Sequence, residues 1–369
     1  MEPVPGRVLP HRELEMELKQ VGWPCRAGCT ETGHLEFEEG LAKGDGIMTA
    51  WGQLRDWLDS LFQPGRGKEP APTLRPRVLL ITYNPIIDSA GRRRLSKVLR
   101  WNDANELCRT YIADLRESSG GYVEYEIVER IELDAWPVKE DGFRYDDDIF
   151  LDNWRRRRGW HQPDTADYEA ILAEIDLLKR VDSDQIDEVW MFGFPYAGFY
   201  ESRMVGPDAF WCNAPAMPRT DVSRRFVIMG FNYERGVGPM LESFGHRVES
   251  HLAHAWRGWQ GQDNLWKQFI RYEKTAPGQA GCGTVHFAPN SESDYDWGNP
   301  NRVLSNCDDW LNFPNFRGVA RTVDATEWGS GDMRAHHKGW LRHLPRASGR
   351  TRGIYNYWWW YAVDPNAVK

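Results

Sequence analysis

The chain alternates between segments patterned as strands and segments patterned as helices from about residue 75 to residue 260. Apolar runs of strand length occupy residues 78–83, 188–194 and 226–231, and residues 122–133 alternate as a strand should. Helical periodicity appears at residues 104–117, after Pro163 and from Pro239 onward. Continuous apolar runs of strand length are typical of strands that are buried on both faces of a sheet. The alternation therefore predicts an α/β fold with a mostly parallel sheet and flanking helices.

Two aspartates are predicted to begin helices in this region. Asp103 precedes an apolar stripe that includes Leu107 and Leu115, and Asp164 precedes a second stripe that includes Leu172. An aspartate side chain can accept hydrogen bonds from the free backbone N–H groups in the first turn of a helix. We therefore expect one helix directly after Asp103 and another directly after Asp164.

The chain is predicted to form an N-terminal extension and one domain. Residues 1–75 contain a single amphipathic stripe at residues 47–62, followed by a linker rich in Pro and Gly. Residues 76–369 are expected to fold as one α/β domain. After Trp259 the periodicity fades, and Gly, Asn, Asp, Pro and Trp dominate. This C-terminal third is therefore predicted to be loop-rich and Trp-rich and to pack on the sheet.

The helix that begins at Pro239 carries polar residues of the metal-binding type. Glu242, His246 and Glu249 lie at i, i+4 and i+7, so they project from one face of the helix. The apolar residues share another face, which is expected to pack on the sheet: Leu241, Phe244, Val248, Leu252 and Ala255. A carboxylate and an imidazole one turn apart can bind one transition metal ion. An ordinary polar helix face is the alternative that the sequence leaves open.

A histidine in a loop completes the predicted metal site. His286 leaves a short β-like run and precedes a segment rich in oxygen ligands at residues 290–299. We therefore predict a metal ion, with zinc favoured, bound by His246, His286 and one of the two helix carboxylates. Asp294 and Asp296 also resemble part of a calcium-binding loop, so calcium is the alternative ion.

The ends of the predicted strands supply candidate catalytic and substrate-binding residues, because ligands of open α/β sheets bind beyond the carboxyl ends of the strands. The predicted catalytic residues are Glu201, Tyr233, Glu234 and Arg235. A glutamate would act as general base on a metal-bound water, and Arg235 or Tyr233 would stabilise the developing oxyanion. The predicted substrate-binding residues are Tyr196, Asn232, Asn290, Asp294, Asp296 and Trp297.

Composition narrows the classes of function. A net charge of −8 argues against a nucleic-acid binder held by a general positive field, and the arginine run at residues 155–158 is interpreted as a solvated loop. No apolar run in the sequence approaches the roughly 18 residues of a membrane span. The 19 Trp residues favour a glycan ligand, because aromatic planes with a polar edge stack on sugar rings, although most of them are expected in the core.

The cysteine content argues against the disulfide scaffold of a small secreted protein, since the chain has only 6 Cys residues. Cys282 and Cys307 flank one loop-rich segment. The sequence is consistent with a disulfide between them in an oxidising compartment and equally with two free thiols.

Several segments of the chain resemble a broad set of uncharacterised bacterial proteins, many of which look secreted. The resemblance rests on residues 230–238, 283–290 and 293–298 and on the Trp-rich C-terminus, and it covers about residues 76–365. It implies one indivisible domain and an extracellular setting, and it transfers no catalytic role. The first residues lack the basic and apolar regions of a signal peptide, so the sequence leaves the compartment open.

The leading interpretation is a metal-dependent hydrolase that uses a metal-bound water on an extracellular polymer, with a glycan slightly favoured over a peptide. One alternative is a metal-free glycosidase with two catalytic carboxylates. The other is a non-catalytic glycan-binding protein, which would expose coplanar Trp side chains. A shared metal requires the imidazoles of His246 and His286 to lie within about 8 Å of each other, because bonds from the ion to its ligands are about 2 Å long.

Overall fold

The computed structural model describes residues 73–369. The predicted amphipathic helix at residues 47–62 and most of the predicted extension lie outside the described residues. Among the described residues, no helix has both the length and the apolar character that crossing a bilayer would need.

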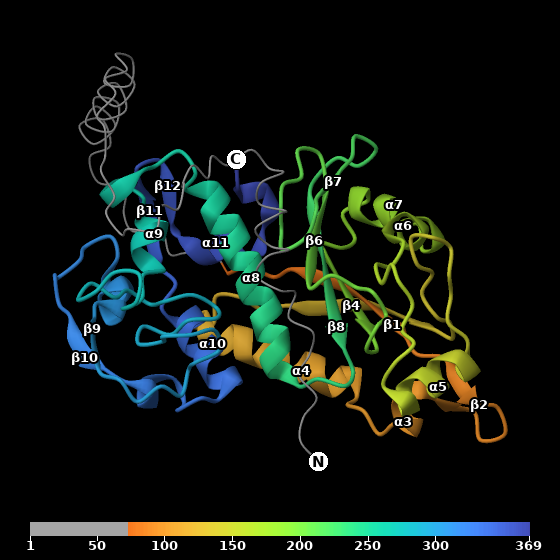
Figure 1. Cartoon of the computed structure of the whole chain (residues 1–369). Helices are drawn as coiled ribbons and strands as arrows, with labels where there is room; N and C mark the ends of the chain where they lie inside the picture. The colour runs from red at the N-terminus through yellow and green to blue at the C-terminus, as the bar shows by residue number, and fades with distance from the viewer. Residues whose placement is uncertain (1–72) are drawn as a thin grey trace, which may run out of the picture. The chain divides into compact units, whose positions relative to one another are not determined.

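A six-stranded sheet forms the centre of the described domain (Figure 1). Its strands, in spatial order, are β4 (Glu126–Leu133), β1 (Arg77–Tyr83), β5 (Glu188–Gly193), β8 (Phe226–Asn232), β6 (Ser202–Gly206) and β7 (Met217–Pro218). The first four strands run parallel, β6 pairs with β8 in the antiparallel direction, and β7 is parallel to β6. The prediction of an α/β fold with a mostly parallel sheet is confirmed, and the antiparallel pair β6–β8 is an addition to it.

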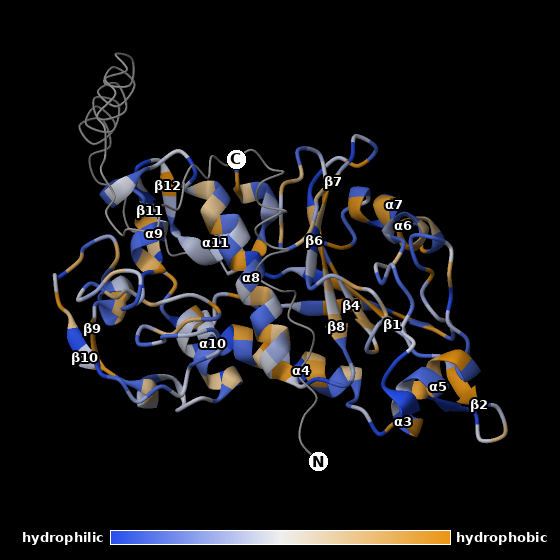
Figure 2. Ribbon diagram, viewed as in Figure 1, coloured by the Kyte–Doolittle hydropathy of each residue, from blue (hydrophilic) through white to orange (hydrophobic). Residues whose placement is uncertain are grey.

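The burial of each strand follows its place in the sheet. In β1, Leu79 and Ile81 enter the core on one face, while Val78 and Leu80 enter the core on the other. The edge strand β4 instead alternates between exposed and half-buried residues. Figure 2 shows apolar residues concentrated in the central strands and polar residues frequent in the surface loops. Continuous apolar runs therefore marked the strands with neighbours on both sides.

Helices cover both faces of the sheet. On one face lie α4 (Ala104–Ser118) and α8 (Val237–Ala255), whose Tyr111 and Phe244 share a core with the strands. The other face is covered by α5 (Asp147–Arg156), α6 (Tyr168–Glu174) and α7 (Leu177–Asp182). Asp103 caps α4 as predicted, since its side chain accepts a hydrogen bond from the backbone N–H of Asn105 at 2.9 Å.

The predicted helix start at Asp164 is wrong. Asp167 caps the helix instead, by accepting a hydrogen bond from the backbone N–H of Ala170 at 3.0 Å. The carboxylate of Asp164 pairs with the buried ammonium group of Lys139, with 2.8 Å between Oδ1 and Nζ. A buried charge needs a partner, and this contact between residues distant in sequence overrides the local capping preference.

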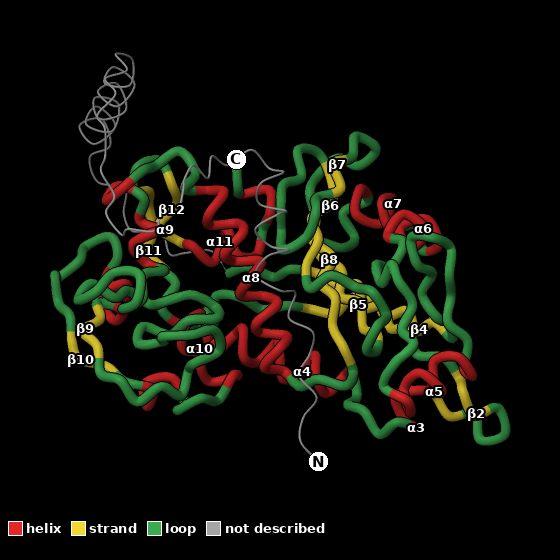
Figure 3. Tube along the Cα trace, viewed as in Figure 1, coloured by secondary structure: helices red, strands yellow, loops and turns green. Residues whose placement is uncertain are grey.

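The C-terminal third contains short elements joined by long loops (Figure 3). They are η1 (Gly261–Asp263), α9 (Leu265–Phe269), β9 (Val303–Ser305), η2 (Cys307–Asn312), β10 (Arg321–Val323), η3 (Ala325–Trp328), α10 (Met333–Arg342), β11 (Arg346–Thr351), β12 (Ile354–Tyr357), α11 (Trp358–Val363) and η4 (Pro365–Ala367). Three further short elements, β2 (Ile86–Asp88), β3 (Arg93–Arg94) and α3 (Leu95–Val98), follow β1.

This C-terminal third packs mainly on helices α4 and α8, and its last element, η4, also contacts strand β8 of the sheet. Helix α10 contacts both α4 and α8, and α11 contacts α8. The ring of Trp359 stacks on Phe244 of α8, with 6.1 Å between the ring centroids. The aromatic C-terminal end therefore docks as predicted, and it continues the core that α8 begins.

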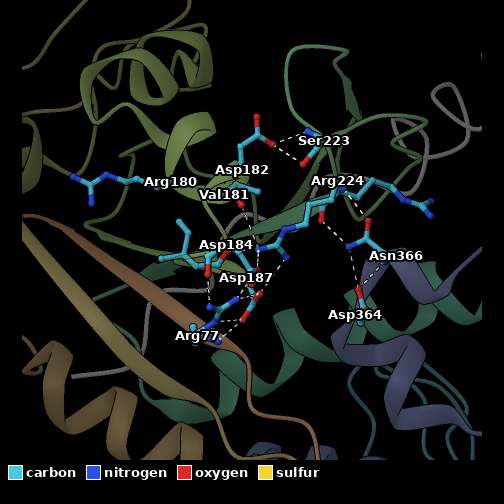
Figure 4. A network of polar contacts seen from close by, with 12 residues as sticks. Arg77, Arg180, Val181, Asp182, Asp184, Asp187, Ser223, Arg224, Asp364 and Asn366 are labelled. Carbon is cyan, nitrogen blue, oxygen red and sulfur yellow. Dashed lines mark hydrogen bonds and ion pairs between the residues drawn. The ribbon is translucent and has the colours of Figure 1, made fainter.

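A polar network ties the C-terminal end to the starts of three central strands (Figure 4). Arg77 of β1 and Arg224 before β8 both pair with Asp187, which directly precedes β5, at 2.9 and 3.1 Å. Asn366 of η4 donates a hydrogen bond to the backbone oxygen of Arg225 at 3.0 Å. The two arginines and their shared carboxylate hold the amino ends of β1, β5 and β8 together.

Candidate metal centre

Helix α8 carries the polar face that the sequence predicts. Leu241, Phe244 and Val248 are fully buried in the core. Glu242 and His246 lie on another face, against the loop at residues 282–296, and Glu242 is itself only 6% exposed. The C-terminal third therefore covers this face of the helix, so an ordinary solvated helix face does not describe it.

Gly245 lets the loop approach the helix closely. A Cβ atom at this position would lie 2.6 Å from Cγ2 of the fully buried Val285. Glu249, one turn further along, accepts a hydrogen bond from the backbone N–H of Val285 at 3.0 Å. Because Val285 rests against the helix, the next residue, His286, is placed opposite His246.

Two adjacent histidines of α10 hold the same loop from its other side. The Nε2 atoms of His336 and His337 lie 3.1 and 3.2 Å from the backbone oxygen of Val285. Burial lowers the pKa of His336 to about 3 and that of His337 to about 4, so both rings are neutral and each donates its Nε2–H to this oxygen. They position the loop, a role that the sequence analysis did not assign to them.

The ligand atoms of Glu242, His246 and His286 converge. The two Nε2 atoms lie 3.0 Å apart, and Nε2 of His286 lies 3.2 Å from Oε1 of Glu242. All three ligand atoms lie within 4.8 Å of one another. Two ligand nitrogens of a tetrahedral zinc ion would lie about 3.3 Å apart, because each Zn–N bond is about 2.0–2.1 Å long. The group can therefore hold one metal ion, and the distance condition set from the sequence is met.

Each imidazole of this group is oriented by a carboxylate at its other nitrogen. Nδ1 of His246 lies 3.1 Å from Oε2 of Glu249, and Nδ1 of His286 lies 3.0 Å from Oδ1 of Asp294. A carboxylate accepts the Nδ1–H, which leaves the lone pair of Nε2 free for a metal, and this pairing is usual for histidine ligands. Glu249, predicted as a possible ligand, contacts Nδ1 of His246, and Asp294, predicted to bind substrate, contacts Nδ1 of His286.

The charges of the group favour a cation. Burial by itself lowers the pKa of His246, but the hydrogen bond to Glu249 and the charges of Glu201, Glu249 and Glu242 outweigh it and raise this pKa to about 9. Burial raises the pKa of Glu242, but hydrogen bonds from His286 and Tyr295 prevail and lower it to about 2. In the absence of a metal ion, His246 therefore binds a proton, and its positive charge is stabilised by the surrounding carboxylates.

Two further side chains face the converging ligand atoms. Oε2 of Glu201, which directly precedes β6, lies 3.9 Å from Nε2 of His246 and accepts a hydrogen bond from Asn213 at 2.7 Å. The hydroxyl of Tyr295 donates to Oε1 of Glu242 at 2.7 Å and lies 3.1 Å from Nε2 of His286. Glu201 is among the residues predicted from the sequence, whereas Tyr295 is not, and its position between two predicted residues, Asp294 and Asp296, is the only signal for it.

The last residue of β8 and the turn after it contain four predicted residues that lie apart from this group. Tyr233 is buried against Phe192, whereas Glu234 and Arg235 are exposed, and the side chain of Asn232 accepts a hydrogen bond from the backbone N–H of Glu234. Within the described part of the chain, no hydrogen bond or ion pair joins these side chains to the converging ligands. Their catalytic and substrate-binding roles stay predictions.

The remaining predicted residues have structural contacts of their own. Trp297 is 3% exposed and stacks on His336, with 4.8 Å between centroids, so its faces are closed to a sugar ring. Tyr196 stacks on Trp160 at 3.9 Å. Asn290 donates to the backbone oxygens of Asn299 and Asn301, and Asp296 accepts from Asn299.

Comparison of the chain with protein-family models, with curated proteins and with solved structures finds no match. Its class therefore follows from the fold and the site alone. It is an α/β protein with a Glu/His/His group that could hold a metal ion.

Proposed function

We propose that the protein is a metal-dependent hydrolase whose metal ion is bound by Glu242, His246 and His286. The observation that supports this proposal is the convergence of two Nε2 atoms and one carboxylate oxygen, with the opposite nitrogen of each imidazole held by a carboxylate. Two imidazoles and one carboxylate are the donor set of one class of catalytic zinc sites, in which water occupies a fourth position. The metal would lower the pKa of that water and make it a nucleophile at neutral pH.

Zinc is the ion proposed, rather than calcium. Imidazole nitrogens suit zinc and other transition metals, whereas calcium takes six to eight oxygen ligands. The carboxylates of the predicted calcium loop are engaged elsewhere, since Asp294 contacts Nδ1 of His286 and Asp296 contacts the amide of Asn299.

Glu201 is the proposed general base. Its side chain is 41% exposed and lies 3.9 Å from Nε2 of His246, so it can reach both the metal site and solvent. A carboxylate at this distance can accept a proton from a metal-bound water. The hydroxyl of Tyr295 is the proposed donor to a developing oxyanion, in place of the predicted Tyr233 and Arg235.

The proposed substrate is an extracellular polymer that is recognised by hydrogen bonds. The loop that carries His286 also lines a cavity of about 380 Å³ with Asn290, Ser291 and Glu292, and Lys274 lines the same cavity. Of the Trp residues in the described part of the chain, Trp211 is the one that is clearly exposed. A polar glycan or peptide therefore suits this surface better than a ligand held by a platform of stacked Trp rings.

Metal content tests the proposal first. We would measure it by mass spectrometry on full-length protein purified without an affinity tag, for the wild type, His246→Ala and His254→Ala. His254 lies on the same helix and stacks on Phe210 at 3.8 Å, outside the metal group, so it serves as the matched control. We expect near-stoichiometric zinc in the wild type and the control and its loss in His246→Ala. Calcium alone, or no metal, would contradict the proposal.

Assays of hydrolysis test whether the metal-loaded protein is catalytic and whether Glu201 is its general base. The zinc-loaded protein would be assayed on oligosaccharides, peptides and simple esters, with and without a chelator. Glu201→Gln should keep the metal and lower turnover by about 100-fold or more, the size expected for loss of a general base. Equal turnover in the wild type and Glu201→Gln would remove Glu201 from the mechanism.

A further inference from the structure

Cys282 and Cys307 lie side by side at the base of the loop that carries His286. A parallel bridge pairs Ala280 with Ser305, and the backbone N–H of Asn306 donates to the oxygen of Ala280 at 3.0 Å. Each cysteine lies two residues beyond this bridge along its own segment, and Cys307 is the first residue of η2. The bridge brings the two segments to the separation of paired strands, about 4.8 Å, and a disulfide spans Cα separations of about 4.4–6.8 Å.

The two cysteines are free thiols in contact. Sγ of Cys282 lies 3.7 Å from the backbone oxygen of Cys307. Cys282 is 3% exposed, whereas Cys307 is half-buried. Cys307 is therefore more accessible than Cys282 to a reagent in solvent.

A positively charged histidine lies next to Cys307. Nδ1 of His343 lies 2.7 Å from the backbone oxygen of Gly339, and its Nε2 lies 3.2 Å from Oδ1 of Asp308. Both oxygens are acceptors only, so both ring nitrogens must carry a proton, and the ring is an imidazolium ion. The charge of this ring lowers the pKa of the Cys307 thiol.

The surroundings of the two thiols shift their pKa values in opposite directions. Burial raises the pKa of Cys307, but the hydrogen bond from Cys282 and the positive charge of His343 outweigh it and lower that pKa below its usual value. Burial raises the pKa of Cys282. The half-buried thiol is thus the nucleophile, because the thiolate is the reactive form of cysteine.

We propose that Cys307 and Cys282 form a thiol–disulfide exchange site that reacts with a low-molecular-weight disulfide such as oxidised glutathione. The thiolate of Cys307 attacks one sulfur of the disulfide, and a mixed disulfide forms while one glutathione leaves as thiolate. Cys282 then loses its proton and attacks Sγ of Cys307, which releases the second glutathione and forms the Cys282–Cys307 bond. Two protein thiols are oxidised, and one external disulfide is reduced to two thiols.

The Cys282–Cys307 disulfide would link the loop that carries His286 covalently to η2. Cys282 lies four residues before His286, and its backbone N–H already donates to the oxygen of Phe269 at 2.7 Å. Oxidation would thus add a covalent link between the base of the His286 loop and the segment that follows β9. The exchange chemistry stands independently of the metal proposed above.

The experiment exposes the full-length protein to oxidised glutathione at pH 7 and maps its peptides by mass spectrometry. Peptide mapping distinguishes this pair from the other four cysteines. We expect a Cys282–Cys307 disulfide in the wild type. Cys282→Ser should stop at a mixed disulfide on Cys307, because the second attack is removed. If both cysteines stay free in protein with a native circular dichroism spectrum, or if Cys307 links to another residue, the proposal is wrong.

A second measurement tests the role of His343 as a positioning residue. The rate at which iodoacetamide alkylates Cys307 would be followed against pH in the Cys282→Ser background, with and without His343→Gln. We expect the midpoint of this rate profile to move to higher pH in His343→Gln and the rate at pH 7 to fall about tenfold, since less thiolate is present. Cys108, which is buried on α4, is the internal reference. An unchanged profile, or alkylation of Cys307 no faster than that of Cys108, would contradict the proposal.

Discussion

At the scale of single residues, hydrogen bonds at one ring nitrogen decide what the other nitrogen can do. Glu249 and Asp294 hold the Nδ1 atoms of His246 and His286, so the Nε2 atoms face each other and Glu242. Spacing along the helix identified the residues at positions 242, 246 and 249. It could not say that one glutamate faces the shared site while the other orients an imidazole, because that depends on where the loop lies.

Glu249→Gln tests this distinction. The amide keeps the size of the side chain but removes its charge, so it orients His246 less strongly and makes Nε2 a poorer ligand. We expect zinc affinity to fall about 10- to 100-fold, the range seen when such supporting partners are removed. Competition with a chromophoric chelator would measure it. Glu234→Gln, at an exposed position in the turn after β8, is the control and should bind zinc like the wild type. Equal affinities for all three proteins would contradict the assigned role of Glu249.

At the scale of elements, the site exists because a loop and a helix touch without an intervening side chain. Gly245 provides this close approach, and His336 and His337 hold the oxygen of Val285 from the opposite side. The sequence analysis predicted α8 and a loop around His286 as separate features. Their contact joins residues about 40 positions apart, and no local pattern encodes it.

Gly245→Ala should therefore disturb the metal site without touching a ligand. The new methyl group would lie 2.6 Å from Cγ2 of Val285, so the loop must shift away from the helix. We expect a loss of stability of about 1–3 kcal/mol, as for other overpacked positions, together with weaker zinc binding. Urea denaturation and zinc titration would measure the two effects. Gly258→Ala, where the added atom has no neighbour within 4 Å, is the control. Unchanged zinc binding in Gly245→Ala would show that the loop does not need this approach.

At the scale of the whole described domain, α8 links the sheet to the C-terminal third. Arg247 is fully buried, and its Nη1 lies 2.7 Å from Oε2 of Glu188 on β5. Its Nη2 donates to the backbone oxygen of Val363 in α11. One guanidinium group thus joins a central strand, the helix of the site and the C-terminal end.

Arg247→Met should be among the most damaging substitutions in the chain. It would leave the carboxylate of Glu188, which is 2% exposed, without its cation. Removal of one partner from a buried ion pair costs about 3–5 kcal/mol. Urea denaturation followed by circular dichroism would measure the change in free energy of unfolding. The control is Arg116→Met, because Arg116 pairs with Glu124 at the surface and its side chain is 63% exposed. A change below about 1 kcal/mol is expected for this exposed pair, and similar losses for both variants would refute the prediction.

The buried aromatic residues at the C-terminal end of the chain should also increase the free energy of unfolding. Trp358 is fully buried among the rings of Trp256, Trp310 and Phe313, whereas Trp211 is 38% exposed. We expect Trp358→Ala to cost about 3–5 kcal/mol and Trp211→Ala to cost far less. Thermal unfolding would compare them, and Trp358→Phe provides a milder change if the alanine variant does not fold. A fall in melting temperature as large for Trp211→Ala as for Trp358→Ala would contradict the docking of the C-terminal end.

The sequence by itself determined the features that depend on neighbours along the chain. Apolar runs identified β1, β5 and β8, periodicity identified α4 and α8, and the spacing of Glu242 and His246 placed both on one face of a helix. These patterns reflect strand and helix geometry, which repeats over a few residues. Only the tertiary structure decided which loop lies against α8, why Asp167 rather than Asp164 caps α6, and which of the Trp residues in the described part of the chain are buried in the core. Those outcomes depend on contacts between residues far apart in sequence, where burial, charge pairing and close packing outweigh local preference.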